Sequence, residues 1–223
     1  MMKKFIYMVA SLAFLTACHS TTTTETTQTT ATTEQTTAAI KQSNGEADLS
    51  LGIQMIVNKK HKLPADYNPG ENPNAGEKVR ELIKKMQELG FSISNQYSGF
   101  RSYEYQTKLY QNYVNKDGKE AADTYSARPG YSEHQTGLAF DILNGTGGLL
   151  GENPQDEKAI EWLHSHAHEY GFIVRFQEGK EAITGYQAEA WHLRYVGDIA
   201  EQIYTSKLTL EEYFGVEGGN YAD

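Results

Sequence analysis

Cysteine is almost absent from this sequence of 223 residues: Cys18 is the only one, so no disulfide can form within the chain. Positive charge is also scarce, because 20 Lys and Arg stand against 29 Asp and Glu, a formal net charge of −9. Proteins that bind nucleic acids present a basic face, so we expect no nucleic-acid partner. The sequence also lacks a Gly-x-Ser-x-Gly nucleophile motif and a glycine-rich phosphate-binding loop.

Apolar runs are short, and the most prominent lies near the N-terminus. Residues 5–15 form it after two lysines; the run is too short to cross a bilayer comfortably but fits the core of a signal peptide. It leads into Leu15-Thr-Ala-Cys18, which resembles the lipobox of bacterial lipoproteins. We therefore expect residues 1–17 to be a lipoprotein signal peptide. Cys18 would then carry a lipid that anchors the protein to the extracellular face of the membrane. The alternative is an ordinary secretory signal followed by an unrelated cysteine.

The next segment, residues 18–50, is polar and low in complexity. Residues 21–37 are mostly threonine and contain no aromatic or large aliphatic side chain. Such a segment cannot bury enough apolar surface to offset its ordering entropy. We predict a flexible, disordered stalk over residues 18–50 and one folded domain over residues 51–223.

The folded part mixes helical and strand patterns without regular alternation. Apolar spacing predicts helices over 76–89 and 102–114, another from Asn153, and short helices near 198–205 and after Thr209. Strand patterns fall at 53–57, 91–94, 137–142, 172–176 and just before Tyr195. This mixture predicts the α+β class, with a small, mainly antiparallel sheet flanked by helices.

The first motif with chemical potential is Ser132-Glu-His-Gln-Thr-Gly-Leu-Ala-Phe-Asp141. From Gly137 on, the alternation predicts a strand whose apolar side chains share one face while Asp141 lies on the other. A carboxylate among apolar neighbours is costly to bury unless it is paired or binds a cation. A loop ahead of Gly137 can bring the His134 imidazole beside it.

The second motif is Glu189-Ala-Trp-His-Leu-Arg-Tyr195. On a strand, His192 and Arg194 share one face, and the aromatic side chains share the other. The aromatic face suits a core and the His/Arg face suits a site. Because Glu189 would face away from His192 on an ideal strand, we expect it at a bend before the strand begins.

Together the motifs supply two imidazoles and two carboxylates. Catalytic zinc takes three protein ligands and keeps a fourth position for water, so His134, Asp141 and His192 suffice to hold Zn²⁺. Glu189 then remains free to take a proton from the metal-activated water. The residues alone leave an alternative open, because a histidine near an aspartate is often a hydrogen-bonded structural pair.

The two motifs, in this order, resemble the VanY/LdcB group of peptidoglycan carboxypeptidases, whose patterns are Ser-x-His-x-x-Gly-x-Ala-x-Asp and Glu-x-x-His. The resemblance runs from about residue 58 to 213 and includes residues 98–102, 105–106 and 126–130. It implies the fold shared by the D-Ala-D-Ala dipeptidases and the hedgehog signalling domain. It also implies a zinc cofactor.

By that resemblance, the zinc ligands are His134, Asp141 and His192, and Glu189 is the general base. Arg101 would contact the substrate near the scissile carbonyl or the terminal carboxylate. Further contacts to the terminal D-alanine would come from Gln106, Ser126 and Ser132. We expect a monomer acting on peptidoglycan stem peptides, as an L,D-carboxypeptidase on tetrapeptides like the streptococcal LdcB type. A D,D-carboxypeptidase acting on pentapeptides is the alternative.

Two hypotheses of other classes remain. One is a non-enzymatic zinc-binding cell-wall lipoprotein on the same fold, against which the presence of Glu189 speaks. The other is a zinc-scavenging lipoprotein that uses His164, His166 and His168. Only the first and last of these face each other on a helix, so we expect a solvated helix face there.

Overall fold

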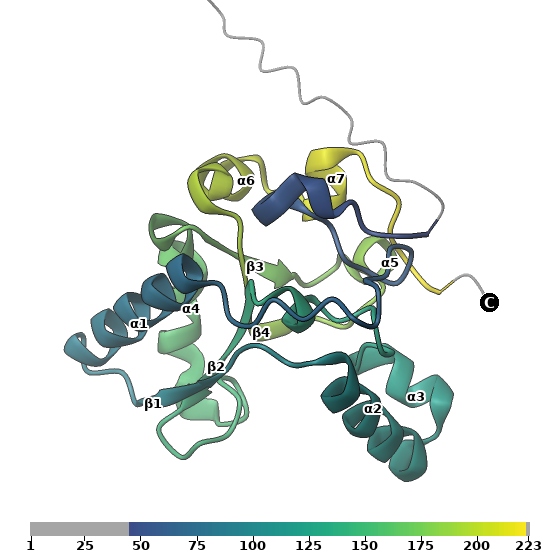
Figure 1. The fold of residues 1–223 in the computed structure, drawn as a ribbon. Helices are drawn as coiled ribbons and strands as arrows, with labels where there is room; N and C mark the ends of the chain where they lie inside the picture. The colour runs from purple at the N-terminus through teal and green to yellow at the C-terminus, as the bar shows by residue number, and fades with distance from the viewer. Residues whose placement is uncertain (1–44, 222–223) are drawn as a thin grey trace, which may run out of the picture. The chain divides into compact units, whose positions relative to one another are not determined.

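The structure, a computed structural model, describes residues 45–221. Its four-stranded sheet has the order β1-β2-β4-β3, and every neighbouring pair is antiparallel (Figure 1). The strands are β1 (Ile93–Ser98), β2 (Ala139–Asn144), β3 (Phe172–Phe176) and β4 (Glu189–Tyr195). This arrangement confirms the predicted α+β class.

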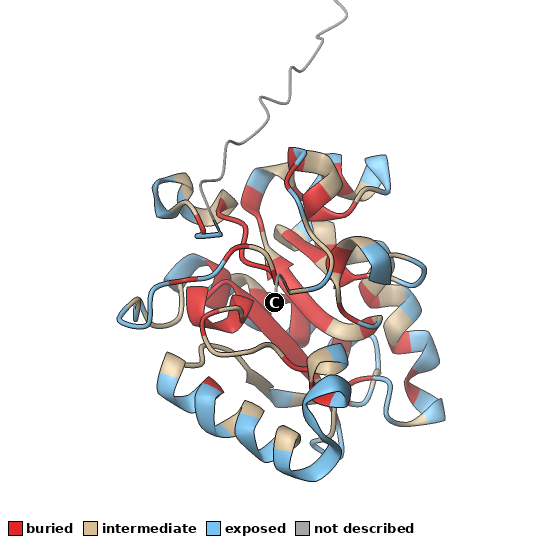
Figure 2. Ribbon diagram, turned by 90° about the vertical axis from the view of Figure 1, so that its right-hand side faces the viewer, coloured by how far each residue is buried: buried red, intermediate tan, exposed pale blue. Residues whose placement is uncertain are grey.

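Two helices pack against the sheet to form the main core. Helix α1 (Pro73–Glu88) begins at Asn72, whose side chain accepts a hydrogen bond from the Ala75 amide at 3.0 Å. Helix α4 (Glu157–His166) continues into the 3-10 turn η4 (Ala167–Tyr170). Apolar side chains of both helices meet those of the sheet in one cluster, which Figure 2 shows as buried ribbon at the centre.

The other helices surround this core. Helices α2 (Tyr103–Asp117) and α3 (Lys119–Tyr125) form a pair that lies away from α1 and α4 (Figure 1). The later helices are α5 (Glu181–Thr184), α6 (Ala200–Ser206) and α7 (Leu210–Phe214). The remaining 3-10 turns are η1 (Leu49–Gln54), η2 (Glu133–Thr136), η3 (Pro154–Asp156) and η5 (Gly197–Ile199). In the described part of the chain, no helix combines the length and apolar character needed to cross a membrane.

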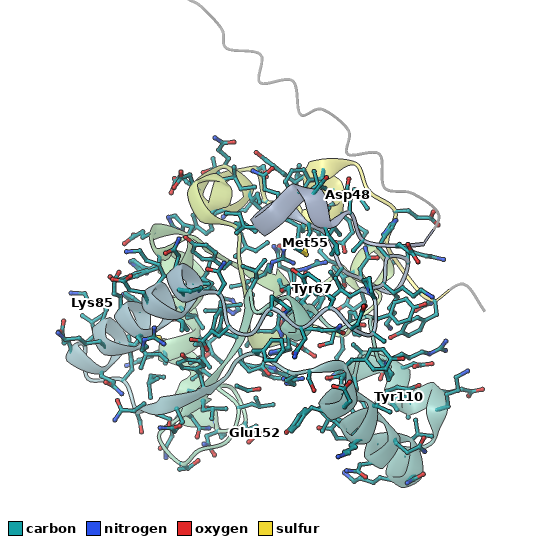
Figure 3. The ribbon with its side chains drawn as sticks, in the orientation of Figure 1. Asp48, Met55, Tyr67, Lys85, Tyr110 and Glu152 are labelled. Atoms are coloured by element: carbon teal, nitrogen blue, oxygen red, sulfur yellow. The ribbon has the colours of Figure 1, made fainter. Side chains whose placement is uncertain are left out.

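The predicted strand at residues 53–57 is wrong. The chain forms η1 there, broken at Gly52 (φ 56°), and then runs on without pairing into the sheet. Arg194 explains the difference, because its Nη2 donates to the carbonyl of Met55 at 2.6 Å and to that of Ile53 at 3.1 Å. The buried Met55 lies just below η1 (Figure 3).

Several helices and strands predicted from short local signals agree with the structure. The strand at 172–176 and the helix after Thr209 are confirmed, the latter with the capping box of Thr209 and Glu212. The segment after Asn153 also has its capping box, although its first turn is 3-10. The helix predicted over 102–114 extends to Asp117, and the separate helix α3 was not predicted. The predicted signal peptide, Cys18 and nearly all of the predicted stalk lie outside the described residues.

Candidate active site

The pairing of β2 with β4 brings the two motifs together. Asp141 lies directly opposite His192 in this ladder. His134 precedes β2 on η2, which ends at Gly137 in the left-handed conformation (φ 71°). A Cβ on Gly137 would lie 2.0 Å from the carbonyl oxygen of Gly70, so only glycine fits at this turn.

His134, Asp141 and His192 converge as the sequence predicted. Their potential ligand atoms all lie within 4.8 Å of one another, and all three side chains are buried. His134 Nε2 lies 3.2 Å from Asp141 Oδ2, and His192 Nδ1 lies 2.9 Å from Asp141 Oδ1. Burial opposes the ionised form of Asp141, but the two histidines outweigh it and hold the pKa of this carboxyl well below its usual range. Two imidazoles and one carboxylate form a donor set suited to zinc.

The hydrogen bonds of His134 fix its tautomer. Nδ1 lies 2.7 Å from the carbonyl oxygen of Gly99, which can only accept, so Nδ1 carries the proton. Nε2 lies 2.9 Å from Nη2 of Arg101, which can only donate, so Nε2 is an unprotonated acceptor. Burial and the charge of Arg101 lower the pKa of His134 to about 4. A neutral imidazole with Nε2 free is the state that a metal ligand requires.

His192 has an acidic group at each ring nitrogen. Nδ1 faces Asp141, and Nε2 lies 3.4 Å from Oε2 of Glu133. Burial lowers the pKa of His192, but the hydrogen bonds to the two carboxylates outweigh it and raise the pKa to about 9. A divalent cation bound at Nδ1 would replace the proton there, while Glu133 keeps Nε2–H in place. The three ligands therefore fit a metal ion, and the groups that orient the two imidazoles, the Gly99 carbonyl and the Glu133 carboxylate, are also in place.

Glu133 belongs to a buried ionic network that the sequence did not reveal. Its Oε1 accepts from Arg175 Nε at 2.8 Å and from Arg194 Nη1 at 2.9 Å. Arg175 also donates to both carboxylate oxygens of Glu211, at 2.6 and 2.8 Å. Burial disfavours the charge on Glu133, but the two guanidinium groups outweigh it and lower its pKa. Arg194, expected on the site face, thus supports His192 through Glu133. The only sequence signal was the place of Glu133 between Ser132 and His134.

Glu189 lies beside the trio, but not at a bend ahead of the strand as predicted. It is the first residue of β4, and the register between β3 and β4 shifts before His192: Phe176 pairs with Glu189, whereas Val174 pairs with Leu193. This bulge brings Glu189 Oε2 within 3.7 Å of His192 Nδ1. Burial raises the pKa of Glu189 to about 7. A carboxyl poised near neutrality is suited to general acid–base chemistry.

Arg101 reaches the same point from the segment between β1 and α2. Its Nη2 donates to Asp141 Oδ2 and approaches His134 Nε2. Ser98 Oγ accepts from Nε and Nη2 of this guanidinium at 3.3 and 3.1 Å, which orients it. A fixed cationic fork beside the ligand atoms can bind a carboxylate or a developing oxyanion.

These residues line a cavity of about 610 Å³. All of the predicted substrate contacts line it too: Arg101, Gln106, Ser126 and Ser132. Gln106 Nε2 donates to the Ala127 carbonyl at 2.7 Å, while its buried Oε1 has no partner within residues 45–221. The rim includes Glu152, on the loop after β2 (Figure 3). Tyr186 and Trp191 also line the cavity and were not assigned to a site from the sequence.

The histidine cluster lies elsewhere, and the prediction of a solvated helix face is wrong. His164, His166 and His168 are half-buried, and the α-helix gives way to η4 between the last two. Within the described chain, they form no group of three convergent ligands. His164 and His168 line a second cavity of about 570 Å³ between α4, β3 and α6.

Comparison with known proteins places this geometry in a family. A crystal structure of the L,D-carboxypeptidase DacB from Streptococcus pneumoniae is 62% identical, with a TM-score of 0.72, covering 75% of this chain and 89% of the other. A vancomycin-resistance D,D-pentapeptidase VanY mutant, solved in complex with Zn(II), is 31% identical with a TM-score of 0.60, covering 72% and 97%. A D-alanyl-D-alanine carboxypeptidase from Enterococcus faecalis is 32% identical over 198 residues, 81% of this chain and 71% of that protein.

The sequence model of one family, VanY D-alanyl-D-alanine carboxypeptidase, matches residues 68–198. This match spans most of the described chain, including β1 to β4 and every residue of the converging cluster. The chain belongs to the VanY carboxypeptidase family.

Proposed function

We propose that this protein is a zinc-dependent carboxypeptidase that removes the terminal D-alanine from peptidoglycan stem peptides, acting as an L,D-carboxypeptidase on tetrapeptides. One observation carries the proposal: three buried side chains with potential ligand atoms converge beside the carboxyl group of Glu189. Within the described residues, this carboxyl group forms no ion pair with a Lys or Arg side chain. The kinship with metallo-carboxypeptidases gives this arrangement its chemistry.

Zinc would be held by His134 Nε2, His192 Nδ1 and the Asp141 carboxylate. When bound, it supplies Lewis acidity that polarises a carbonyl and lowers the pKa of water towards about 7. Glu189 takes the proton of the attacking water and passes it to the nitrogen of the departing D-alanine. Its pKa, raised to about 7 by burial, suits both transfers.

The other cavity residues hold the substrate. The Arg101 guanidinium neutralises negative charge on the substrate next to the scissile bond, where Ser98 keeps it oriented. Gln106 Oε1 faces no protein donor in the described chain, so it accepts a hydrogen bond from a substrate N–H. Ser126 and Ser132 offer hydroxyl groups on the same wall.

The preference for tetrapeptides is supported by similarity. The L,D-carboxypeptidase DacB is 62% identical, about twice the identity to the D,D-enzymes. Those D,D-enzymes support the alternative, a D,D-carboxypeptidase acting on pentapeptides. The non-enzymatic hypothesis is disfavoured, because a binding protein has no use for Glu189 beside the ligands.

We further propose that the enzyme is a monomer anchored to the extracellular face of the cell membrane by a lipid on Cys18. The support is the lipobox-like sequence Leu15-Thr-Ala-Cys18. Cys18→Ser should release the protein from the membrane fraction. Unchanged membrane association of this variant would contradict the anchor, and gel filtration of the domain tests the monomer.

The deciding experiment incubates the purified enzyme with defined tetrapeptide and pentapeptide muropeptides, with and without a chelator. We expect D-alanine release from the tetrapeptide, abolished by the chelator and restored by zinc. Glu189→Gln should lower kcat by about 10²–10⁴-fold while zinc content stays unchanged. Release from the pentapeptide alone would establish the D,D alternative, and no release from either would overturn the proposed function.

A further inference from the structure

Tyr221 lies behind the substrate cavity rather than in it. The segment that carries it leaves α7 and runs past α5, the yellow trace near the C label in Figure 1. Two hydrogen bonds hold this segment: Gly219 N–H donates to the Ile183 carbonyl at 2.6 Å, and Asn58 donates to the Glu217 carbonyl at 3.1 Å. Tyr221 is not among the cavity-lining residues, so any influence on the substrate passes through its neighbours.

Those neighbours surround the Tyr221 ring with charge and aromatic surface. The guanidinium carbon of Arg128 lies 3.9 Å from the ring centroid, and Lys59 Nζ lies 5.2 Å from it. Tyr131 meets the ring edge-on at 5.0 Å. The Tyr221 hydroxyl lies 3.4 Å from that of Tyr186. Both of these tyrosines line the cavity, so Tyr221 braces its wall from outside.

The most specific contact is with the peptide unit that joins Ala127 to Arg128. The Arg128 N–H donates to the Tyr221 hydroxyl at 2.8 Å. The Ala127 carbonyl, on the opposite edge of the same planar unit, accepts from Gln106 Nε2 at 2.7 Å. One peptide plane is therefore clamped between Tyr221 on the outside and Gln106 on the cavity side.

This clamp decides which end of Gln106 faces the cavity. The Ala127 carbonyl can only accept, so the amide nitrogen of Gln106 must face it and Oε1 is left over. Oε1 is buried and has no partner within residues 45–221, which leaves it available to a ligand. The Arg128 guanidinium is itself paired with Asp123 at 2.7 Å. Rotation of the peptide plane would turn Gln106 away from its present orientation.

We propose that Tyr221 is a positioning residue for substrate binding: its hydroxyl orients the 127–128 peptide, which in turn orients Gln106 towards the substrate. The effect on substrate binding rests on the proposed function. The orientation of the peptide does not depend on it.

The test is a double-mutant cycle of Tyr221→Phe and Gln106→Ala in the zinc-loaded enzyme, with the tetrapeptide as substrate. Tyr221→Phe keeps the ring and removes the hydroxyl, so KM should rise about threefold with kcat nearly unchanged, well below the 10²-fold cost of a 1 Å misplacement at the reacting centre. In the Gln106→Ala background the same change should alter KM by less than about 1.3-fold, because the residue it orients is gone. Additive effects of the two substitutions would overturn the proposal.

A second measurement is independent of activity. Hydrogen exchange at the Arg128 amide should be faster in Tyr221→Phe, since this N–H loses its acceptor. Gly218→Ala should speed it too, because a Cβ there meets the Ile183 carbonyl oxygen at 2.2 Å and displaces the segment. Tyr204→Ala, on α6 beside the second cavity, is the matched control and should change neither KM nor hydrogen exchange at the Arg128 amide.

The outcomes separate the two proposals. If the wild-type protein releases no D-alanine, the proposed function fails, but Arg128 exchange still decides the role of Tyr221. Unchanged exchange in Tyr221→Phe contradicts the positioning role even in an active enzyme. A parallel loss of kcat and melting temperature, without the KM change, would show a merely structural role and overturn the proposal as well.

Discussion

Two groups of histidines in this protein look alike in composition and differ in organisation. His134 and His192 lie far apart in the sequence, yet both aim a ring nitrogen at Asp141. His164, His166 and His168 lie within one stretch of five residues, yet each has its own separate partner: the Ala190 carbonyl at 3.1 Å, the Trp162 carbonyl at 2.8 Å and the Glu201 carboxylate at 3.1 Å.

The difference lies in what holds the second ring nitrogen. In the cavity, the Gly99 carbonyl and the Glu133 carboxylate take the outward nitrogens and leave the inward ones facing a shared point. In the cluster, ring stacking fixes the rings instead: His166 lies 4.5 Å from the Trp162 ring, and His168 lies 3.9 Å from the Tyr204 ring. A metal site needs ligand atoms that converge on one point and partners that hold each imidazole in place. The register of β2 and β4 brings such atoms together here, whereas a run of histidines along one segment does not.

The largest expected effect contrasts the two groups directly. His134→Ala removes a ligand, so the purified enzyme should lose its zinc, and turnover should fall by more than about 10³-fold as the pKa of water returns towards about 15.7. His164→Ala should keep both zinc and turnover. Elemental analysis and D-alanine release measure the two variants side by side. Retention of zinc by His134→Ala, or its loss from His164→Ala, would reverse the comparison.

The second prediction removes the support of His192 rather than a ligand. Glu133→Ala leaves two buried guanidinium groups without their shared carboxylate and should lower the free energy of unfolding by about 3–5 kcal/mol. Zinc affinity should also fall by about 10–100-fold. Urea unfolding in chelator and competition with a zinc indicator measure these quantities.

A matched control for Glu133 is Glu81→Ala on α1. It breaks the exposed pair of Lys78 and Glu81 at 2.7 Å, which solvent screens, so the free energy of unfolding should fall far less than in Glu133→Ala. Similar losses of the free energy of unfolding in Glu133→Ala and Glu81→Ala would mean that the buried ionic network stabilises the fold no more than a surface ion pair does. Unchanged zinc affinity in Glu133→Ala would remove its role as support for the metal ligand.

These contrasts also mark what the sequence allowed us to predict. Strand alternation predicts the faces on which Asp141 and His192 lie, whereas their role as metal ligands is what the family resemblance implies. The caps at Asn153 and Thr209 follow from signals a few residues long. Glu133 does not follow, because its partners Arg175, Arg194 and His192 lie on β3 and β4, far along the chain, and no local pattern links them to it.

The errors have the same origin. The 53–57 alternation predicted a strand, but carbonyls in this segment accept from Arg194, a residue far along the chain. The two-residue repeat of a regular strand predicts that Glu189 faces away from His192 unless the chain bends before the strand. In the structure, a bulge opposite Phe176 brings Glu189 to the same side as His192 instead. Periodicity predicts which residues share an element; it cannot predict which tertiary contact overrides that element.

The third prediction concerns pH and the metal-free protein. The pKa of Glu189 is 4.5 in the unfolded chain and about 7 in the folded one, so ionising it costs the folded state roughly 3 kcal/mol. This cost is absent below about pH 4.5 and complete above about pH 7, so stability from this group falls as pH rises through that window. Glu189→Gln should therefore be more stable than wild type at pH 8 and equal to it at pH 4.5.

Chemical unfolding of both proteins in chelator, at several pH values, measures this difference. Glu178→Gln is the control, since its carboxyl is exposed and the variant should track wild type throughout. A constant difference between Glu189→Gln and wild type across the range would show that burial does not shift this carboxyl.

The smallest effect belongs to the histidine cluster. His166→Ala removes one hydrogen bond to the Trp162 carbonyl and one ring stacked at an interplanar angle of 8°, both at a half-buried surface. We expect a loss of about 1 kcal/mol in the free energy of unfolding, with zinc content and kcat/KM unchanged. Thermal unfolding with elemental analysis checks this. A change in zinc affinity from this variant would mean that the two histidine groups communicate. Their separate partners argue against this, because His164, His166 and His168 each contact a group other than the three converging side chains of the active site.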